Sequence, residues 1–242
     1  MLLRIEFGGA FNFLMLAVVQ ARINSSRLPG KALIRLGNES ILGLTVNRLK
    51  RSSKISSLVI ATSDLPADDE IENHAIKLGL EVYRGNLEDV GSRLLKAAIS
   101  RNADAFARIS ADSPFIDWRI VDHAVSLYQA CHPDLVTNIF PRTFPKGQSV
   151  EIIKTSTLAG ICKIERTPQQ MEHVTPFFYD HFKDLEIISF TSGIDSSASV
   201  HCIDDKDDFE RAEEIVKEMN HQDCSWQDLE EFLKKRKFEV AA

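Results

Sequence analysis

The stretch Met15-Leu-Ala-Val-Val-Gln20, followed directly by Ala-Arg-Ile-Asn-Ser-Ser-Arg-Leu-Pro-Gly-Lys31, decides the fold. Its first part is a short apolar run rich in valine, which is typical of a buried strand. Its second part is polar, contains three cations and includes the turn-forming pair Pro29-Gly30. In α/β proteins ligands bind where such strands end in loops, so this stretch predicts both a central strand and a binding loop.

Further apolar, β-rich runs alternate with helical patterns along the chain. We expect strands at residues 16–20, 57–62, 80–83, 104–109 and 134–139. We expect helices at 41–49, 71–78, 90–99 and 120–128, from the spacing of their apolar residues. This alternation predicts right-handed βαβ crossovers, and therefore an α/β fold with three αβα layers around a mainly parallel sheet.

Beyond residue 140 the pattern is less regular. Two prolines and a glycine between Pro141 and Gln148 indicate a loop over the site or a subdomain boundary. After it we expect strands at 150–153, 185–190 and 200–203, helices at 155–164 and 170–182, and an amphipathic helical region at 207–237.

The composition is that of an ordinary globular protein. Of 242 residues, 44% are hydrophobic and 26% are charged, so the chain can bury a core without disulfides or structural metals. The net charge is −6. An acidic balance argues against nucleic acid as a partner, because phosphate backbones are bound by basic surfaces. An anionic ligand must therefore be held by a local cluster of Arg and Lys.

The chain carries no pattern of a secreted disulfide protein or of a membrane protein. The apolar run 11–19 is shorter than the roughly 20 residues that span a bilayer, so no membrane span is expected. Met15 is a natural start of the first strand, so 1–14 is predicted to be an N-terminal extension, although Arg4 before an apolar run leaves a signal peptide as an alternative. Scattered cysteines favour a reducing, cytoplasmic location. They are Cys131, Cys162, Cys202 and Cys224.

The loop after the first strand has the composition of a polyphosphate site. Arg22, Arg27 and Lys31 lie within ten positions, and guanidinium groups bind phosphate oxygens in a forked geometry while lysine supplies a point charge. A Walker P-loop is excluded, because Ser25 takes the place of its first glycine and Ala32 that of its Ser or Thr. The alternative is a solvated basic turn.

Two carboxylates follow other expected strands. Asp112 comes just after strand 104–109, and Asp204 opens an acidic run after strand 200–203. Carboxylates at such positions can hold a magnesium ion that bridges phosphates. The alternatives are a helix cap at Asp112 and an acidic helix start at Asp204. His173 lies in no metal-binding pattern and is by itself more often a packed residue than a ligand.

Six sequence segments occur along the chain in an order that is far more specific than any one of them. They are Gln20 to Lys31, Val59-Ile-Ala-Thr-Ser-Asp64, Tyr83-Arg-Gly85 with Asp89-Val90, Arg108-Ile-Ser-Ala-Asp112-Ser-Pro114, Glu172-His-Val-Thr-Pro176 and Ile203-Asp204. In this order the sequence resembles the cytidylyltransferase family that includes the 3-deoxy-manno-octulosonate and acylneuraminate cytidylyltransferases, and in particular its spore coat polysaccharide biosynthesis protein F branch.

The resemblance implies a GT-A-like nucleotide-diphospho-sugar transferase fold and a single domain over 15–242, with a sugar-binding or dimerisation insertion around 140–185. It implies a magnesium-dependent enzyme in which a sugar acid attacks CTP to give a CMP-sugar and pyrophosphate, and it implies a homodimer. The implied nucleotide-binding residues are Gln20, Ala21, Arg22, Ser25, Arg27, Lys31, Thr62 and Arg108. The implied sugar-binding residues are Gln148, Glu151, Glu172 and His173. Arg22, Lys31 and Asp112 would be catalytic, and Asp112 and Asp204 would bind the metal.

The sequence departs from the family pattern at three places. Asn24 replaces a loop glycine, which is tolerable because Asn also adopts positive φ. Gln148-Ser149 replaces a usual Leu-Asp, and the segment 199–202 lacks the arginine that commonly precedes the last Asp. These departures leave two alternatives: a transferase for another nucleotide or a sugar phosphate, and a non-catalytic nucleotide-binding protein.

Overall fold

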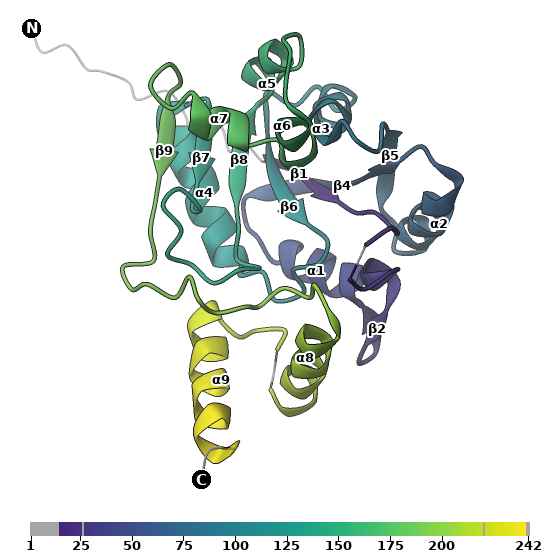
Figure 1. Ribbon diagram of the computed structural model, residues 1–242, viewed down its shortest axis with the longest axis vertical. Coiled ribbons are helices and arrows are strands. Elements are labelled where there is room, and N and C mark those ends of the chain that lie inside the picture. The colour runs from purple at the N-terminus through teal and green to yellow at the C-terminus, as the bar shows by residue number, and fades with distance from the viewer. Residues whose placement is uncertain (1–14, 26, 220, 241–242) are drawn as a thin grey trace, which may run out of the picture.

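A seven-stranded sheet forms the centre of the computed structural model, which describes residues 15–25, 27–219 and 221–240 (Figure 1). The predicted N-terminal extension lies outside the described residues. The strands of the sheet are β1 (Met15–Gln20), β4 (Ile55–Ser63), β5 (Glu81–Gly85), β6 (Ala105–Ser110), β7 (Leu135–Thr137), β8 (Glu151–Lys154) and β9 (Ile187–Ser189). A small hairpin joins β2 (Arg35–Leu36) to β3 (Glu39–Ser40).

The strand order is β5-β4-β1-β6-β8-β7-β9. Strands β5, β4, β1 and β6 are parallel neighbours, β7 and β9 pair in parallel, and β8 is antiparallel to both of its neighbours. The mainly parallel sheet predicted from the alternation of strands and helices is therefore confirmed. The region 140–185 supplies β8 to this sheet, so it is built into the main domain.

Helices cover both faces of the sheet, as the three-layer prediction requires (Figure 1). They are α1 (Ile41–Leu49), α2 (Asp69–Lys77), α3 (Val90–Ile99), α4 (Trp118–Cys131), α5 (Thr155–Ile161), α6 (Pro168–His173), α7 (Pro176–Asp180), α8 (Lys206–Glu218) and α9 (Trp226–Val240). Asp117 caps α4 by accepting a hydrogen bond from the Arg119 backbone, and Gly79, at φ 71°, follows the end of α2. Both positions agree with the sequence signals for helix ends.

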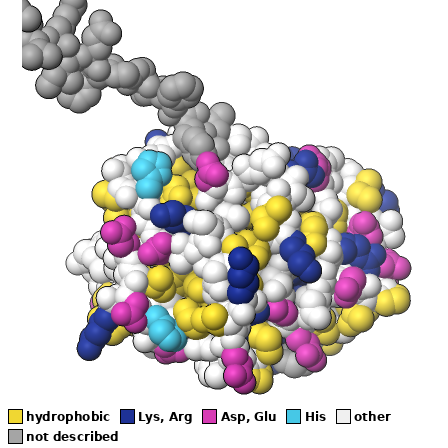
Figure 2. Space-filling view, turned by 90° about the horizontal axis from the view of Figure 1, so that it is seen from above, with side chains coloured by type: hydrophobic (Ala, Val, Ile, Leu, Met, Phe, Trp, Pro, Cys, Tyr) yellow, Lys and Arg dark blue, Asp and Glu magenta, His cyan; other side chains and the backbone are white. Residues whose placement is uncertain are grey.

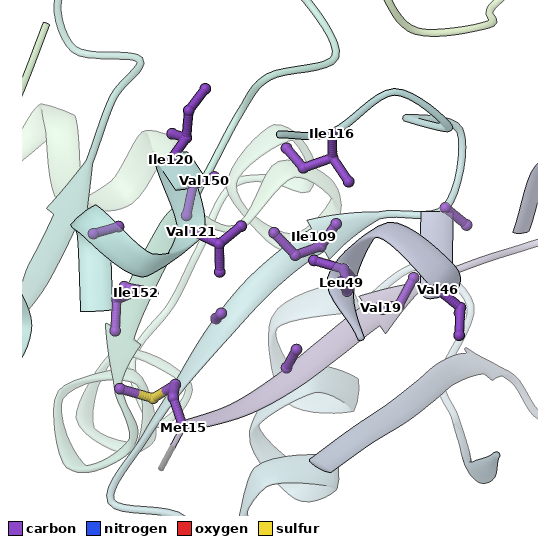
Figure 3. Packing of buried hydrophobic residues seen from close by; sticks show 14 of the residues in the cluster. Met15, Val19, Val46, Leu49, Ile109, Ile116, Ile120, Val121, Val150 and Ile152 are labelled. Atoms are coloured by element: carbon purple, nitrogen blue, oxygen red, sulfur yellow. The ribbon is translucent and has the colours of Figure 1, made fainter. Parts of the chain in front are cut away.

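Alternate residues of β1 serve two cores, because successive strand side chains point to opposite faces. Val19 packs with α1 and α4 on one face, and Val18 packs with α3 on the other. Figure 3 shows the first core, where Val46 and Leu49 of α1 lie over Val19 and Ile109. Burying one such side chain stabilises the fold by roughly 1.5–3 kcal/mol, so this short strand is central to both layers.

A third core joins the C-terminal helices to the domain. Apolar residues of the hairpin, α1, α8 and α9 form it, and α8 and α9 lie together at one end of the molecule (Figure 1). Arg48 of α1 is 2% exposed and donates hydrogen bonds to the carbonyls of Ile116 at 2.6 Å and Cys224 at 2.8 Å. A single buried guanidinium thus fastens the turn between α8 and α9 to the sheet domain.

Two sequence predictions for the second half were wrong in detail, and one element of the first half was not predicted. The helix expected at 170–182 is two short helices, because Val174 adopts φ 66° and Pro176 begins a new helix. The expected strand 200–203 is a single bridge between Lys146 and Val200. The β2–β3 hairpin was not predicted, since its strands are only two residues long.

The surface seen in Figure 2 intersperses acidic and basic side chains. No helix in the described part of the chain is long and apolar enough to cross a membrane.

We predict that Arg48→Met lowers the free energy of unfolding by at least about 3 kcal/mol, because it leaves several buried carbonyls without donors. Urea denaturation followed by circular dichroism measures this change. The control is Arg51→Met, which removes an exposed ion pair with Asp223 and should cost less than about 1 kcal/mol. Equal losses in the two variants would contradict the role of Arg48.

Candidate active site

A cleft of about 310 Å³ opens at the carboxyl ends of β1 and β6. The chain passes from β1 outward to β4 and β5 and then returns to β6 on the other side of β1. This is the topological switch point of the sheet, where α/β folds leave a crevice for ligands. Ten of the residues expected at the site line the cleft: Gln20, Ala21, Arg22, Ser25, Arg27, Lys31, Asp112, Glu172, His173 and Asp204.

The loop after β1 folds back on itself below the cleft. The Gly30 amide donates a hydrogen bond to the Ile23 carbonyl at 2.8 Å, and Gly30 adopts φ 72° just before the short 3₁₀ helix η1 (Lys31–Leu33). Positive φ is inexpensive for glycine and costly for most other residues. The Pro29-Gly30 turn therefore directs Lys31 into the cleft.

Asp68 fixes this loop to the neighbouring strand. It ends the 3₁₀ helix η2 (Pro66–Asp68) and is 2% exposed. Its carboxylate accepts hydrogen bonds from the backbone amides of Ile23 at 2.7 Å and Ser63 at 2.9 Å. Burial alone would raise the pKa of the Asp68 carboxyl, but these bonds and one from the Ser63 hydroxyl outweigh it and lower the pKa. The sequence analysis missed Asp68, whose only signal is its place in the turn after β4.

Lys31 joins the two expected metal ligands. Its ammonium lies 2.6 Å from Asp112 Oδ2 and 2.8 Å from Asp204 Oδ1. Burial would lower the pKa of Lys31, but the two carboxylates outweigh it and raise the pKa. Burial would raise the pKa of Asp204, yet Lys31 and Arg27 together lower it. Both shifts favour the charged forms of Lys31 and Asp204.

Backbone contacts hold the two carboxylates side by side. The Ile203 amide donates to the Asp112 carbonyl at 2.9 Å, which places Asp204 beside the end of β6. Neither carboxylate is a helix cap, since Asp117 caps α4 and Asp205 caps α8. The capping alternative for Asp112 is thus wrong. Within the acidic run, Asp205 caps α8, whereas Asp204 lines the cleft.

The mouth of the cleft is formed by the turn after α6. Glu172, near the end of α6, pairs with Arg22 at 3.0 Å, and both side chains are nearly half exposed. Val174 adopts φ 66° and ψ −63°, and the Thr175 amide donates to the His173 carbonyl at 2.8 Å. This is a γ-turn, which is rare and strained for a β-branched residue. The turn presents Glu172 and His173 to the cleft while Val174 is buried in the core.

Arg93 is a fourth cation that the sequence analysis did not single out. It lies on α3, is 3% exposed and lines the cleft. Its Nη1 donates to the carbonyls of Asn86 and Leu87, and its Nε has no acceptor in the described part of the chain. A buried donor without a partner is costly. An arginine within the apolar pattern of 90–99 was the available signal.

Four residues expected at the site lie behind the cleft or in the core. Arg108 donates to Gln20 Oε1 at 3.0 Å and to Glu151 at 2.7 Å, so it orients Gln20 from behind. Thr62 is fully buried at the end of β4. Gln148 is also fully buried, and its side chain bonds the Asp117 amide and the Phe115 carbonyl. In this structure Gln148 therefore supports the fold and does not line the cleft.

Cations of the loop after β1 and of α3 line this cleft together with Asp112 and Asp204 at the switch point of an α/β sheet, an arrangement that suits a polyphosphate ligand. The sequence profile described as cytidylyltransferase matches residues 16–234. The chain therefore belongs to the cytidylyltransferase family of nucleotidyltransferases.

Individual relatives agree with this assignment. The spore coat polysaccharide biosynthesis protein SpsF of Bacillus subtilis is 33% identical over 174 residues, which cover 69% of this chain and 70% of that protein. The 3-deoxy-manno-octulosonate cytidylyltransferase of Pelobacter propionicus is 28% identical over 187 residues, covering 73% of this chain and 68% of that one. A solved cytidylyltransferase from Leptospira borgpetersenii superposes with a TM-score of 0.87 at 33% identity, covering 92% and 95% of the two chains.

We predict that Asp68→Asn lowers the free energy of unfolding by about 2 kcal/mol at pH 7, because an amide cannot accept from all of these donors. Since the folded-state pKa of Asp68 is lowered, its contribution is present above the ordinary aspartate pKa and is lost as pH falls through the folded value. In urea denaturation measured from pH 7 to pH 3, the free energies of unfolding of the wild type and of Asp68→Asn should therefore converge. A pH-independent gap would contradict this account, and Asp64→Asn, at an exposed neighbour, is the control.

Proposed function

We propose that this protein is a magnesium-dependent enzyme that transfers CMP from CTP to an acidic sugar, releasing pyrophosphate, in the synthesis of a polysaccharide or glycan. The observation that carries the proposal is the contact of Lys31 with both Asp112 and Asp204 beside the cation-bearing loop. The names of the relatives support the nucleotide and the sugar acid, and the name of SpsF supports the polysaccharide.

The chemistry asks for alignment and charge neutralisation. A sugar hydroxyl oxygen would bond to the α-phosphorus of CTP, the bond from that phosphorus to the β-bridging oxygen would break, and the hydroxyl proton would pass to solvent. Negative charge grows on the leaving pyrophosphate, where Arg22, Arg27 and Lys31 would neutralise it. Such positioned cations act without covalent chemistry by the protein.

The carboxylate pair fits a divalent cation. Asp112 and Asp204 already accommodate the ammonium of Lys31 between them at 2.6 and 2.8 Å. Magnesium prefers oxygen ligands, takes one or two carboxylates and completes its shell with phosphate oxygens and water. The described residues contain no third acidic, His or Cys ligand arranged with them, which suits a metal that arrives with the nucleotide. When bound, it would neutralise charge on the phosphates.

Arg93 would bind an oxygen of the nucleotide. Its guanidinium is buried at the cleft with Nε unpaired within the described residues, and an acceptor from the ligand would satisfy it. At the mouth, Glu172 and His173 would face the sugar, while Arg108 and Glu151 would support Gln20 from behind.

We predict that Asp112→Asn reduces magnesium-dependent turnover at least about 100-fold with the fold intact, because a neutral amide is a weak metal ligand. Pyrophosphate release measured with CTP, UTP, ATP or GTP and a panel of 2-keto sugar acids and sugar phosphates tests this. Asp207→Asn, at an exposed position of α8, is the matched control. Unchanged turnover in Asp112→Asn would remove this residue from the site.

We predict that Lys31→Ala weakens CTP binding by about tenfold or more, because the loop loses the cation that is directed into the cleft. Isothermal titration calorimetry measures the affinity, and Lys206→Ala, at an 81% exposed side chain, is the control. An unaltered affinity would count against the loop as the triphosphate site. Clear CTP binding by the wild-type protein without turnover for any substrate pair would favour the non-catalytic alternative.

A further inference from the structure

Beyond Ser110, which lines the cleft, the next strand of the sheet is β8. Arg108 of β6 and Glu151 of β8 are paired across the antiparallel ladder. The ladder ends at this pair; continued by two residues toward the cleft, its register would place Ser149 opposite Ser110, which lines the cleft. Since side chains alternate along a strand, Ser149 is on the same face of the sheet as Arg108 and Glu151. On this register Ser149 would lie next to Ser110, on the side of the cleft toward β8.

Arg142 reaches this position from the end of β7. The bridge between Ile139 and Arg142 places Arg142 beside that strand end. Both Nη1 and Nη2 of Arg142 lie 3.1 Å from the Ser149 hydroxyl oxygen. The two arms of the guanidinium thus converge on one small neutral group, which is the geometry in which an arginine binds an oxyanion.

No carboxylate of the described residues lies within ion-pair distance of Arg142, whereas Arg22, Arg27 and Arg166 each have one. The acid on this face of β8 is Glu151, which is only 4% exposed. Its oxygens accept from Arg108 at 2.7 Å and from the Tyr179 hydroxyl at 2.6 Å. Glu151 is therefore committed elsewhere, and the positive charge of Arg142 is left without an internal counterion.

We propose that Arg142 binds an anionic group of the acceptor sugar, a carboxylate or a phosphate, and that a neutral residue at 149 keeps Arg142 available for it. The proposal rests on the proposed function, because it concerns the second substrate of the same site. The ring of Phe140, two residues before Arg142, is stacked on Tyr179 at a centroid distance of 4.7 Å and would supply an apolar wall for a sugar ring.

Two variants test this role from opposite directions. Arg142→Gln removes the cation, and Ser149→Asp supplies an internal carboxylate at the point where both guanidinium arms converge. Each should raise KM for an anionic acceptor by about tenfold or more and leave KM for CTP within about twofold. Ser149→Ala, which removes only the hydroxyl, should raise KM for the anionic acceptor less than Ser149→Asp does. The matched controls are Arg101→Gln and Ser57→Asp. Both residues are exposed, and Ser57 lies near the start of β4, at the end of that strand away from the cleft.

The acceptors are a 2-keto sugar acid, its neutral amide and a hexose phosphate, each assayed by pyrophosphate release. A KM increase confined to the sugar acid or to the phosphate supports the proposal and identifies which anion Arg142 binds. Unchanged acceptor KM in both variants, or an equal increase with the neutral amide, overturns it while the proposed function stands. Absence of pyrophosphate release by the wild-type protein with every substrate pair overturns the proposed function and this assignment with it.

Discussion

The contact of Lys31 with Asp112 and Asp204 is the interaction on which the arrangement of the site depends. It joins the loop after β1, the end of β6 and the segment before α8, which are separated by 81 and 173 residues in the chain. Partly buried charges are tolerated when each has an opposite partner, and removing one leaves the others uncompensated. The same three charges that hold these segments together are therefore those that a phosphate and a metal would share.

The fold supplies the supports for this contact from outside the cleft. Asp68 ties the loop to β4 through the Ile23 amide, and Arg48 ties the turn before α9 to the sheet domain. Both are charged side chains that are almost completely buried and bonded to backbone groups. Their contacts fix main-chain positions, so the exposed functional side chains of the loop can remain adaptable without loss of the site's geometry.

The sequence predicted the layers and much of the cleft, because strand alternation and strand-end loops are local signals. Arg22 and Asp112 follow their strands within two residues, and Lys31 stands at the end of the loop after β1, so their meeting at one edge followed from the parallel sheet. Contacts made behind the cleft were not predictable in this way. Burial turns Gln148 into a core hydrogen-bonding residue, and the γ-turn at Val174 divides a helix that apolar spacing alone would continue.

The departures from the family pattern at Gln148, Ser149 and 199–202 differ in burial, because Gln148 and His201 are buried whereas Ser149 is partly exposed. Gln148 bonds His201, which in turn contacts Glu230 of α9 at 2.9 Å, so these residues form a buried polar network between the domain and its last helix. The altered residues around 148 and 201 thus belong to one set of buried polar partners, as expected because buried polar groups must satisfy one another. Ser149 differs, because its hydroxyl faces Arg142 at the edge of the cleft. These departures thus leave the charges of the loop after β1 in place, while Arg142 faces a neutral serine.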